Sequence, residues 1–152
     1  MTGIREVHER ATATAGVRET VPTGALPAFF ARALAQTAAA LDAQGIHPIG
    51  PPYGRYYSMP GADVDVEVGF PVSAPVKRTG RVSPGELPGG RVVEALHAGS
   101  FDTLSQTYAE VRRYFEEHDL TPGATMWEQY LTDPSSGADP STWRTRVCWP
   151  VV

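Results

Sequence analysis

An internal repeat constrains the fold of this chain more than any other feature of its sequence. A shift of 74 positions places Phe30 on Leu104 and Leu41 on Phe115 without a gap. The register continues into matched proline and aromatic positions: Pro48 with Pro122, Tyr53 with Trp127, Tyr56 with Tyr130, and Pro60 with Pro134. After an insertion of about five residues, Phe70-Pro71-Val72 falls on Trp149-Pro150-Val151. Such an ordered series predicts two copies of one supersecondary unit.

Each copy contains a helical pattern. Steps of three and four between apolar residues predict amphipathic helices over Leu26–Gln44 and Asp102–His118. In the first, the apolar face is formed by Phe30, Leu34, Thr37 and Leu41. In the second, it is formed by Phe101, Leu104, Tyr108, Val111 and Phe115.

Alternating segments predict the strands. Asp63–Phe70 places Val64, Val66, Val68 and Phe70 on one face, and Tyr53–Met59 is its expected hairpin partner. The equivalent hairpin is Thr125–Leu131 with Trp143–Trp149, and strands near Ala11–Val21 and Arg91–His97 precede the helices. The predicted fold is α+β: a duplicated strand-helix-strand-strand module with pseudo-twofold symmetry, in which an antiparallel sheet carries both helices on one face. Pro71–Arg81 is interpreted as a connector and Gly85–Gly90 as a turn.

The length of 152 residues fits one domain, and neither half offers enough core to be independent. We therefore expect a single domain over 1–152, with repeats at about 6–73 and 80–152.

Composition excludes several functions. A net charge of -4 with scattered Lys and Arg argues against direct nucleic-acid binding, and no segment is apolar enough to cross a membrane. A polar N-terminus and a single cysteine, Cys148, are typical of a cytoplasmic protein, and Cys148 is expected in the core. The four histidines are widely spaced and no phosphate-binding loop or nucleophile elbow is present, so we expect neither metal nor cofactor. His97 is interpreted as a strand-end hydrogen-bonding residue.

Glu128 breaks the symmetry of the repeat, because its counterpart is Gly54. Alternation places it on one face of its strand with Met126 and Tyr130, and both faces are flanked by apolar groups. A carboxylate in such a partly dry position takes up a proton, pairs with a cation or serves a ligand. The residues alone leave open a plain cross-strand pair with Arg144 or Arg146.

Several short motifs in order resemble the GyrI-like effector-binding family, from about Glu6 to Val152. They are Gly50-Pro51-Pro52-Tyr53, Leu87-Pro88-Gly89-Gly90, His97-Ala98-Gly99-Ser100-Phe101-Asp102, Trp127-Glu128-Gln129-Tyr130-Leu131-Thr132-Asp133-Pro134 and Trp149-Pro150-Val151. The resemblance implies an SHS2-like duplicated fold with a ligand cleft between the halves. Regulators of this family sense multidrug-like compounds, often cationic and aromatic, through a central glutamate surrounded by aromatic side chains.

Glu128 matches that glutamate. Tyr130 and its repeat mate Tyr56 are the expected aromatic wall, together with Met126 on the same strand face, and the resemblance adds Phe101 and Trp149. Unlike the regulators, this chain is expected to lack a DNA-binding extension, so the leading hypothesis is a stand-alone module that binds small amphipathic compounds.

Two other functions compete with this hypothesis. Some GyrI-like proteins hydrolyse cyclopropane-containing natural products; here Glu128 would be the general base, with Tyr130 or Tyr56 orienting water. The family's name-giving member antagonises DNA gyrase, which makes a protein partner a third alternative, although the weak negative charge gives it little support.

Overall fold

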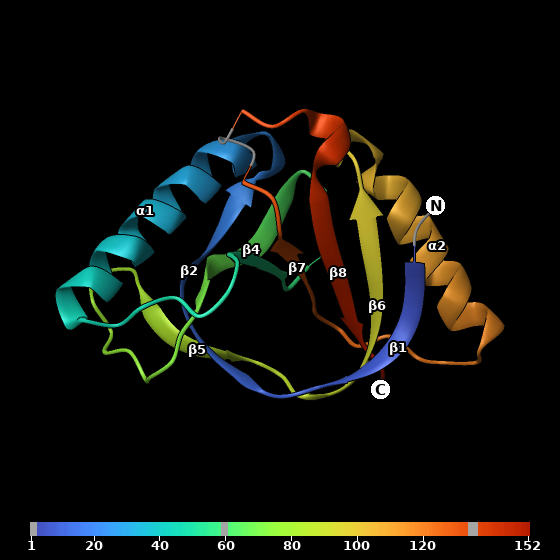
Figure 1. The fold of residues 1–152 in the computed structure, drawn as a ribbon, viewed down its shortest axis with the longest axis horizontal. Coiled ribbons are helices and arrows are strands. Elements are labelled where there is room, and N and C mark those ends of the chain that lie inside the picture. The colour runs from blue at the N-terminus through green and yellow to red at the C-terminus, as the bar shows by residue number, and fades with distance from the viewer. Residues whose placement is uncertain (1–2, 59–60, 134–136) are drawn as a thin grey trace. The chain divides into compact units, whose positions relative to one another are not determined.

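The computed structural model describes residues 3–58, 61–133 and 137–152. It divides the chain into two compact units, each with four strands and one α-helix among these described residues. One unit combines the chain up to Glu9 with Gly90–Val152, and the other is Arg10–Gly89. Both units are α+β with antiparallel strand pairs, as predicted (Figure 1). The placement of both helices on one common face and a cleft between the halves stay predictions.

In the Arg10–Gly89 unit the strand order is β3-β4-β2-β5. Its elements are β2 (Thr12–Pro22), α1 (Leu26–Gln44), β3 (Tyr53–Tyr56), β4 (Asp63–Pro71) and β5 (Ser83–Leu87). Helix α1 is rich in alanine and begins with Pro27 in its first turn, where a missing N–H costs nothing. It ends at Gly45, whose φ of 68° lets Ile46 N–H close the last turn on the carbonyl of Leu41.

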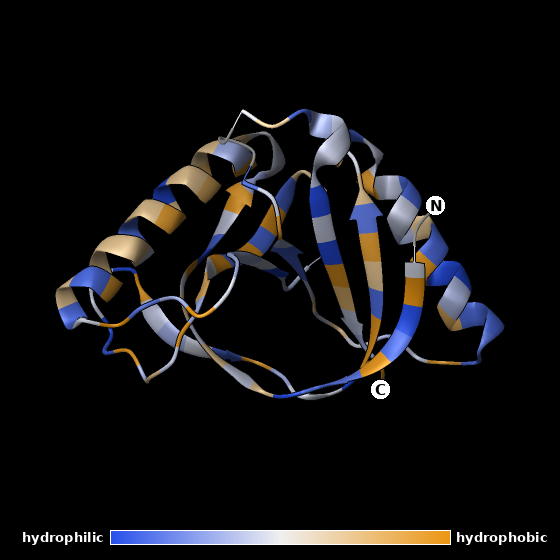
Figure 2. Ribbon diagram, viewed as in Figure 1, coloured by the Kyte–Doolittle hydropathy of each residue, from blue (hydrophilic) through white to orange (hydrophobic). Residues whose placement is uncertain are grey.

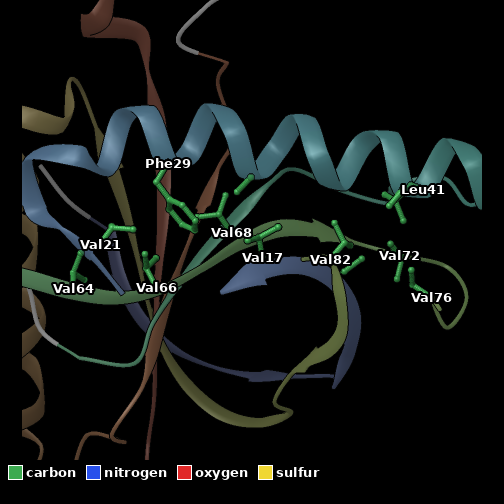
Figure 3. Packing of buried hydrophobic residues seen from close by; sticks show 13 residues of the cluster. Val17, Val21, Phe29, Leu41, Val64, Val66, Val68, Val72, Val76 and Val82 are labelled. Atoms are coloured by element: carbon green, nitrogen blue, oxygen red, sulfur yellow. The ribbon is translucent and has the colours of Figure 1, made fainter. Parts of the chain in front are cut away.

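The core of this unit lies between α1 and the strands. Val64, Val66 and Val68 are fully buried, which confirms the predicted alternation of β4. Phe29 points from α1 toward the strands (Figure 3). The buried face of α1 is rotated slightly from the predicted one, because Phe29 and Ala33 are buried whereas the predicted Phe30 and Leu34 are only partly buried.

In the other unit the strand order is β1-β6-β8-β7. Its elements are β1 (Gly3–Glu9), β6 (Gly90–Ala98), α2 (Leu104–Glu117), β7 (Met126–Tyr130) and β8 (Arg144–Pro150). A 3₁₀ turn at Phe101–Thr103 precedes α2, so the observed α-helix begins at Leu104, two residues after the predicted start. Helix α2 buries Thr107, Val111 and Phe115 and is much more hydrophilic than α1 (Figure 2).

The strand registers support the repeat found in the sequence. Tyr53 lies opposite Gly69, and the matched Trp127 lies opposite Cys148, as the five-residue insertion requires. Upstream of the helices, equivalent residues of the two repeats are four positions further apart in the chain than the 74 found in the helices. The strand pairing shows this, because Glu19 lies opposite Val66 and its structural equivalent His97 lies opposite Thr145. Four residues are about one helical turn, and α1 is the longer helix at its N-terminus.

Two strands were not predicted. β1 pairs with β6, and β5 pairs with β2, so that the N-terminal strand belongs to the unit built mainly from the second repeat. The turn predicted over Gly85–Gly90 is shorter than expected, because β5 continues through Leu87 and β6 begins at Gly90. β1 alternates only weakly and carries four charged or imidazole side chains, while β5 contains Pro84 and Gly85; both are features of edge strands. The connector Pro71–Arg81 lies between β4 and β5, and Met59, Pro60 and Pro134 lie outside the described residues.

Candidate functional site

Glu128 lies in the middle of β7 and is only 4% exposed. It stands opposite Val147 of β8, and alternation puts Met126 and Tyr130 on the same face. This face is turned toward α2, because Tyr108 of α2 contacts both Met126 and Glu128. Its apolar neighbours Met126 on β7 and Val147 on β8 are buried as well.

Two phenols hold the Glu128 carboxylate. Tyr108 donates a hydrogen bond to Oε2, and Tyr130 donates one to Oε1 at 2.7 Å. Burial raises the pKa of Glu128 above the ordinary value for glutamate, although the two phenols and the nearby charge of His97 act in the opposite direction. The two phenols partly compensate the cost of burying the charge, and each carboxylate oxygen keeps further acceptor capacity.

Neither arginine proposed as a cross-strand partner binds Glu128. Arg146 lies opposite Gln129, on the other face of the strand pair, where it donates to Gln129 at 2.9 Å and pairs with Glu94 and Glu9. Arg144 donates instead to two backbone carbonyls, those of Ser141 and Trp143. The simple ion-pair interpretation of Glu128 was therefore wrong.

Further aromatic rings of this unit contact the two tyrosines that bind Glu128. The ring of Phe101 meets that of Tyr130 edge-to-face at 6.0 Å and lies 5.2 Å from that of Trp143. The ring of Trp149 meets that of Tyr108 edge-to-face at 6.2 Å. Phe101 is 38% exposed, so the outer end of this aromatic group reaches solvent.

The structure thus brings together most of the predicted site residues. Tyr130 touches Glu128 directly, whereas Met126 and Trp149 reach it through Tyr108 and Phe101 reaches it through Tyr130. Tyr56 lies in the other unit, where it packs against the core under α1, and its place beside Glu128 stays a prediction.

Sequence reasoning missed Tyr108 and Trp143 as members of the aromatic group. Tyr108 was assigned to the apolar face of its helix, which is correct, but its hydroxyl reaches Glu128. A signal was available, because the repeat places Tyr108 on Leu34, and a hydroxyl at a position that is purely apolar in the other copy needs a polar partner. Trp143 follows a 3₁₀ turn at Pro140–Thr142, and no sequence pattern points to it.

Other chemistry is limited among the described residues. No cluster of three or more potential metal ligands occurs in them, and none of their helices is long and apolar enough to span a membrane. Cys148 is buried, as predicted, and burial raises the pKa of its thiol to about 12. It is therefore unreactive as a nucleophile at neutral pH.

A buried carboxylate that is surrounded by phenols and other aromatic rings provides an environment suited to small organic molecules. The family model of the GyrI-like small molecule binding domain matches residues 3–152, and the chain belongs to this family. No curated protein matches the chain by sequence.

Solved structures share the fold at low sequence identity. The EcmrR C-terminal domain superposes with a TM-score of 0.83 at 20% identity, covering 100% of this chain and 97% of that one. In an EcmrR–DNA complex the TM-score is 0.84 at 18% identity, with 99% of this chain covered, but the match spans only 57% of the EcmrR chain.

Two further structures resemble the whole chain. SAV2435 bound to tetraphenylphosphonium matches with a TM-score of 0.68 at 13% identity, covering 99% of this chain and 94% of that one. A hydrolase from Listeria innocua matches with a TM-score of 0.67 at 18% identity, covering 98% and 91%. At these identities the similarity establishes the fold alone.

Proposed function

We propose that the chain binds small amphipathic compounds, cationic and aromatic, at Glu128. The observation that carries this proposal is a buried carboxylate whose described hydrogen-bond partners are two neutral phenols and no cationic side chain. A desolvated carboxylate attracts a cation far more strongly than an exposed one, and the faces of nearby aromatic rings add a cation–π contribution. The tetraphenylphosphonium bound to SAV2435 is a compound of this class.

Because the pKa of Glu128 is raised, the proposal predicts that cation affinity depends on pH. A protonated Glu128 must release its proton before it can pair with a cation, so affinity for a cation should rise with pH until Glu128 is fully ionised. A neutral ligand of similar shape has no such requirement.

Calorimetric titrations between pH 5 and pH 8 test this proposal. Tetraphenylphosphonium should bind more tightly as the pH rises, and triphenylphosphine oxide should bind with nearly constant affinity. The absence of binding by either compound, or equal pH profiles for both, would refute the proposal.

A second candidate is hydrolysis of a strained ring. Burial raises the pKa of Glu128 and so makes its carboxylate a stronger base, two hydroxyl groups donate to that carboxylate, and one structural neighbour is described as a hydrolase. In this reaction Glu128 would take a proton from a water molecule that Tyr130 orients, and the water oxygen would bond to a cyclopropane carbon as a ring C–C bond breaks. The ring carbon that leaves with the electron pair would then take the proton from Glu128, so that one water is added overall.

Mass spectrometry after incubation with a cyclopropane-containing compound separates the two candidates. Hydrolysis requires a product heavier by one water that the Glu128→Gln variant does not form. Unchanged compound recovered from the complex supports binding alone.

A further inference from the structure

His97 forms a buried polar junction at the end of β6. Its Nε2 lies 2.8 Å from the carbonyl oxygen of Ser100, and its Nδ1 lies 2.6 Å from Oγ1 of Thr107. Because a carbonyl can only accept, Nε2 donates to Ser100, and Nδ1 shares a hydrogen bond with the Thr107 hydroxyl. The hydroxyl of Thr103 lies 3.2 Å from Nε2 and donates to the same carbonyl.

This junction holds the segment that leads into α2. The segment begins at Ser100, carries Phe101 in the 3₁₀ turn and reaches Thr107 on the buried side of the helix. Phe101 contacts the ring of Tyr130, and Tyr108, the next residue after Thr107, donates to Glu128. One histidine is thus bonded to both ends of the segment that carries Phe101 and leads directly to Tyr108.

The other repeat folds without such a junction. By strand register the equivalent of His97 is Glu19, whose carboxylate pairs with Arg32 and Arg81. By the helix match the equivalent of Thr107 is Ala33, which is fully buried in an apolar core. The module therefore does not require a histidine–threonine pair in order to fold, and the pair occurs in the repeat that contains Glu128.

We infer that His97, acting through Thr107, is a positioning residue for the ligand site at Glu128. It fixes the start of α2 so that the Tyr108 hydroxyl meets Glu128 and the Phe101 ring closes on Tyr130. The inference rests on the proposed function for the identity of the ligand, but the positioning of Tyr108 against the Glu128 carboxylate does not depend on a ligand.

Thr107→Val is the sharpest test, because it removes the hydroxyl while keeping the shape of the side chain and leaving the imidazole in place. Thr37→Val is the matched control: Thr37 is also buried, in α1, and its hydroxyl has no hydrogen-bond partner among the described residues. Thr107→Ser restores the hydroxyl and serves as the rescue variant, with thermal unfolding recorded for all three.

Two measurements report on positioning. Affinity for tetraphenylphosphonium should fall about 3- to 10-fold in Thr107→Val, the range expected for one lost hydrogen bond, and should be kept in Thr107→Ser and Thr37→Val. In the ligand-free chain, carbon-13 NMR of the Glu128 carboxyl should show titration at higher pH in Thr107→Val, because Tyr108 donates less effectively to the ionised form.

A double-mutant cycle links the two partners. In His97→Gln the amide nitrogen can still donate to Ser100, but the hydrogen-bond partner of Thr107 is lost. If both residues act through one bond, the double variant with Thr107→Val should bind no more weakly than either single variant.

The possible outcomes separate this inference from the proposed function. A wild-type chain that binds no cation refutes the proposed function, and the titration of Glu128 still decides the role of His97. The inference would be overturned if Glu128 titrated in Thr107→Val as it does in wild type, or if Thr37→Val had an equal effect. If the wild-type chain binds tetraphenylphosphonium, an unchanged affinity in Thr107→Val would overturn it too.

Discussion

Glu128→Gln separates the charge of the candidate site from its shape. The amide oxygen can still accept from one phenol, and the amide nitrogen can donate to the oxygen of the other, so that Tyr108 and Tyr130 both keep a partner. What disappears is the negative charge in a nearly dry position. The variant should therefore affect cationic ligands selectively.

The expected loss follows from two opposing effects. At a separation of about 4 Å and an effective dielectric constant of about 20, a carboxylate and a cation attract each other by about 4 kcal/mol. A cation that displaces one phenol from Glu128 forfeits a hydrogen bond to a charged acceptor, worth about 1.5–3 kcal/mol. The difference is about 1–2.5 kcal/mol, so Glu128→Gln should weaken tetraphenylphosphonium about 5- to 70-fold, with little effect on triphenylphosphine oxide.

Folding stability should change in the opposite direction. The pKa of Glu128 is higher in the folded chain than the reference value of 4.5, so the folded state binds more protons than the unfolded state as the pH rises above that value. Stability contributed by the protonated carboxyl is then lost as the pH rises through the folded pKa. Glu128→Gln does not titrate, so its stability relative to wild type should increase from pH 4.5 to pH 8.

Calorimetric titration with both ligands and thermal unfolding at several pH values test these expectations together. Glu67→Gln is the matched control, because Glu67 also accepts hydrogen bonds from two phenols, those of Tyr53 and Tyr57 at 2.8 Å each, but lies in the other unit. Equal weakening of both ligands, an equal effect of Glu67→Gln, or a Glu128→Gln variant that unfolds more easily at pH 8 would show that the reasoning is wrong.

Three further substitutions test other parts of the structure. Tyr108→Phe removes a donor from the ionised carboxylate, so NMR titration should show a further rise in the pKa of Glu128, and cation affinity at pH 7 should fall. Arg146→Met leaves the buried Glu94 with Arg5 as its one cationic partner among the described residues. Chemical denaturation should show a loss of about 3–5 kcal/mol, and an unchanged midpoint would contradict a structural role for this ion pair. Gly69→Ala would place a Cβ 1.9 Å from the carbonyl oxygen of Ala15, so thermal unfolding should reveal severe destabilisation, and a variant as stable as wild type would refute this packing.

The sequence predicted those elements whose signal is local. Helix α1 was predicted with its observed bounds, and β4 was predicted from clean alternation, because both bury one face against the same core. β1 and β5 were missed because each is defined by pairing with a strand distant in the chain, and edge strands need only weak apolar alternation.

The candidate site was predicted only as far as the repeat and the family resemblance reached. Glu128 stood out because its repeat counterpart is a glycine, and Tyr130 followed from the period of the strand. The contribution of Tyr108 depends on how far a side chain on α2 reaches toward β7, a tertiary distance that periodicity does not encode. The partner of Glu128 was uncertain for the same reason, since cross-strand register decides which side of β8 faces it.

The two repeats differ at the polar positions that build the site. Three pairs of equivalent positions show this: Glu128 with Gly54, His97 with Glu19, and Thr107 with Ala33. A buried carboxylate and a buried imidazole both carry a desolvation cost that hydrogen bonds offset only in part. The first repeat demonstrates that the same module folds with a glycine, an exposed ion pair and an alanine at these positions. Folding therefore does not account for the polar residues of the second repeat, whereas the proposed binding of cations at Glu128 would account for them.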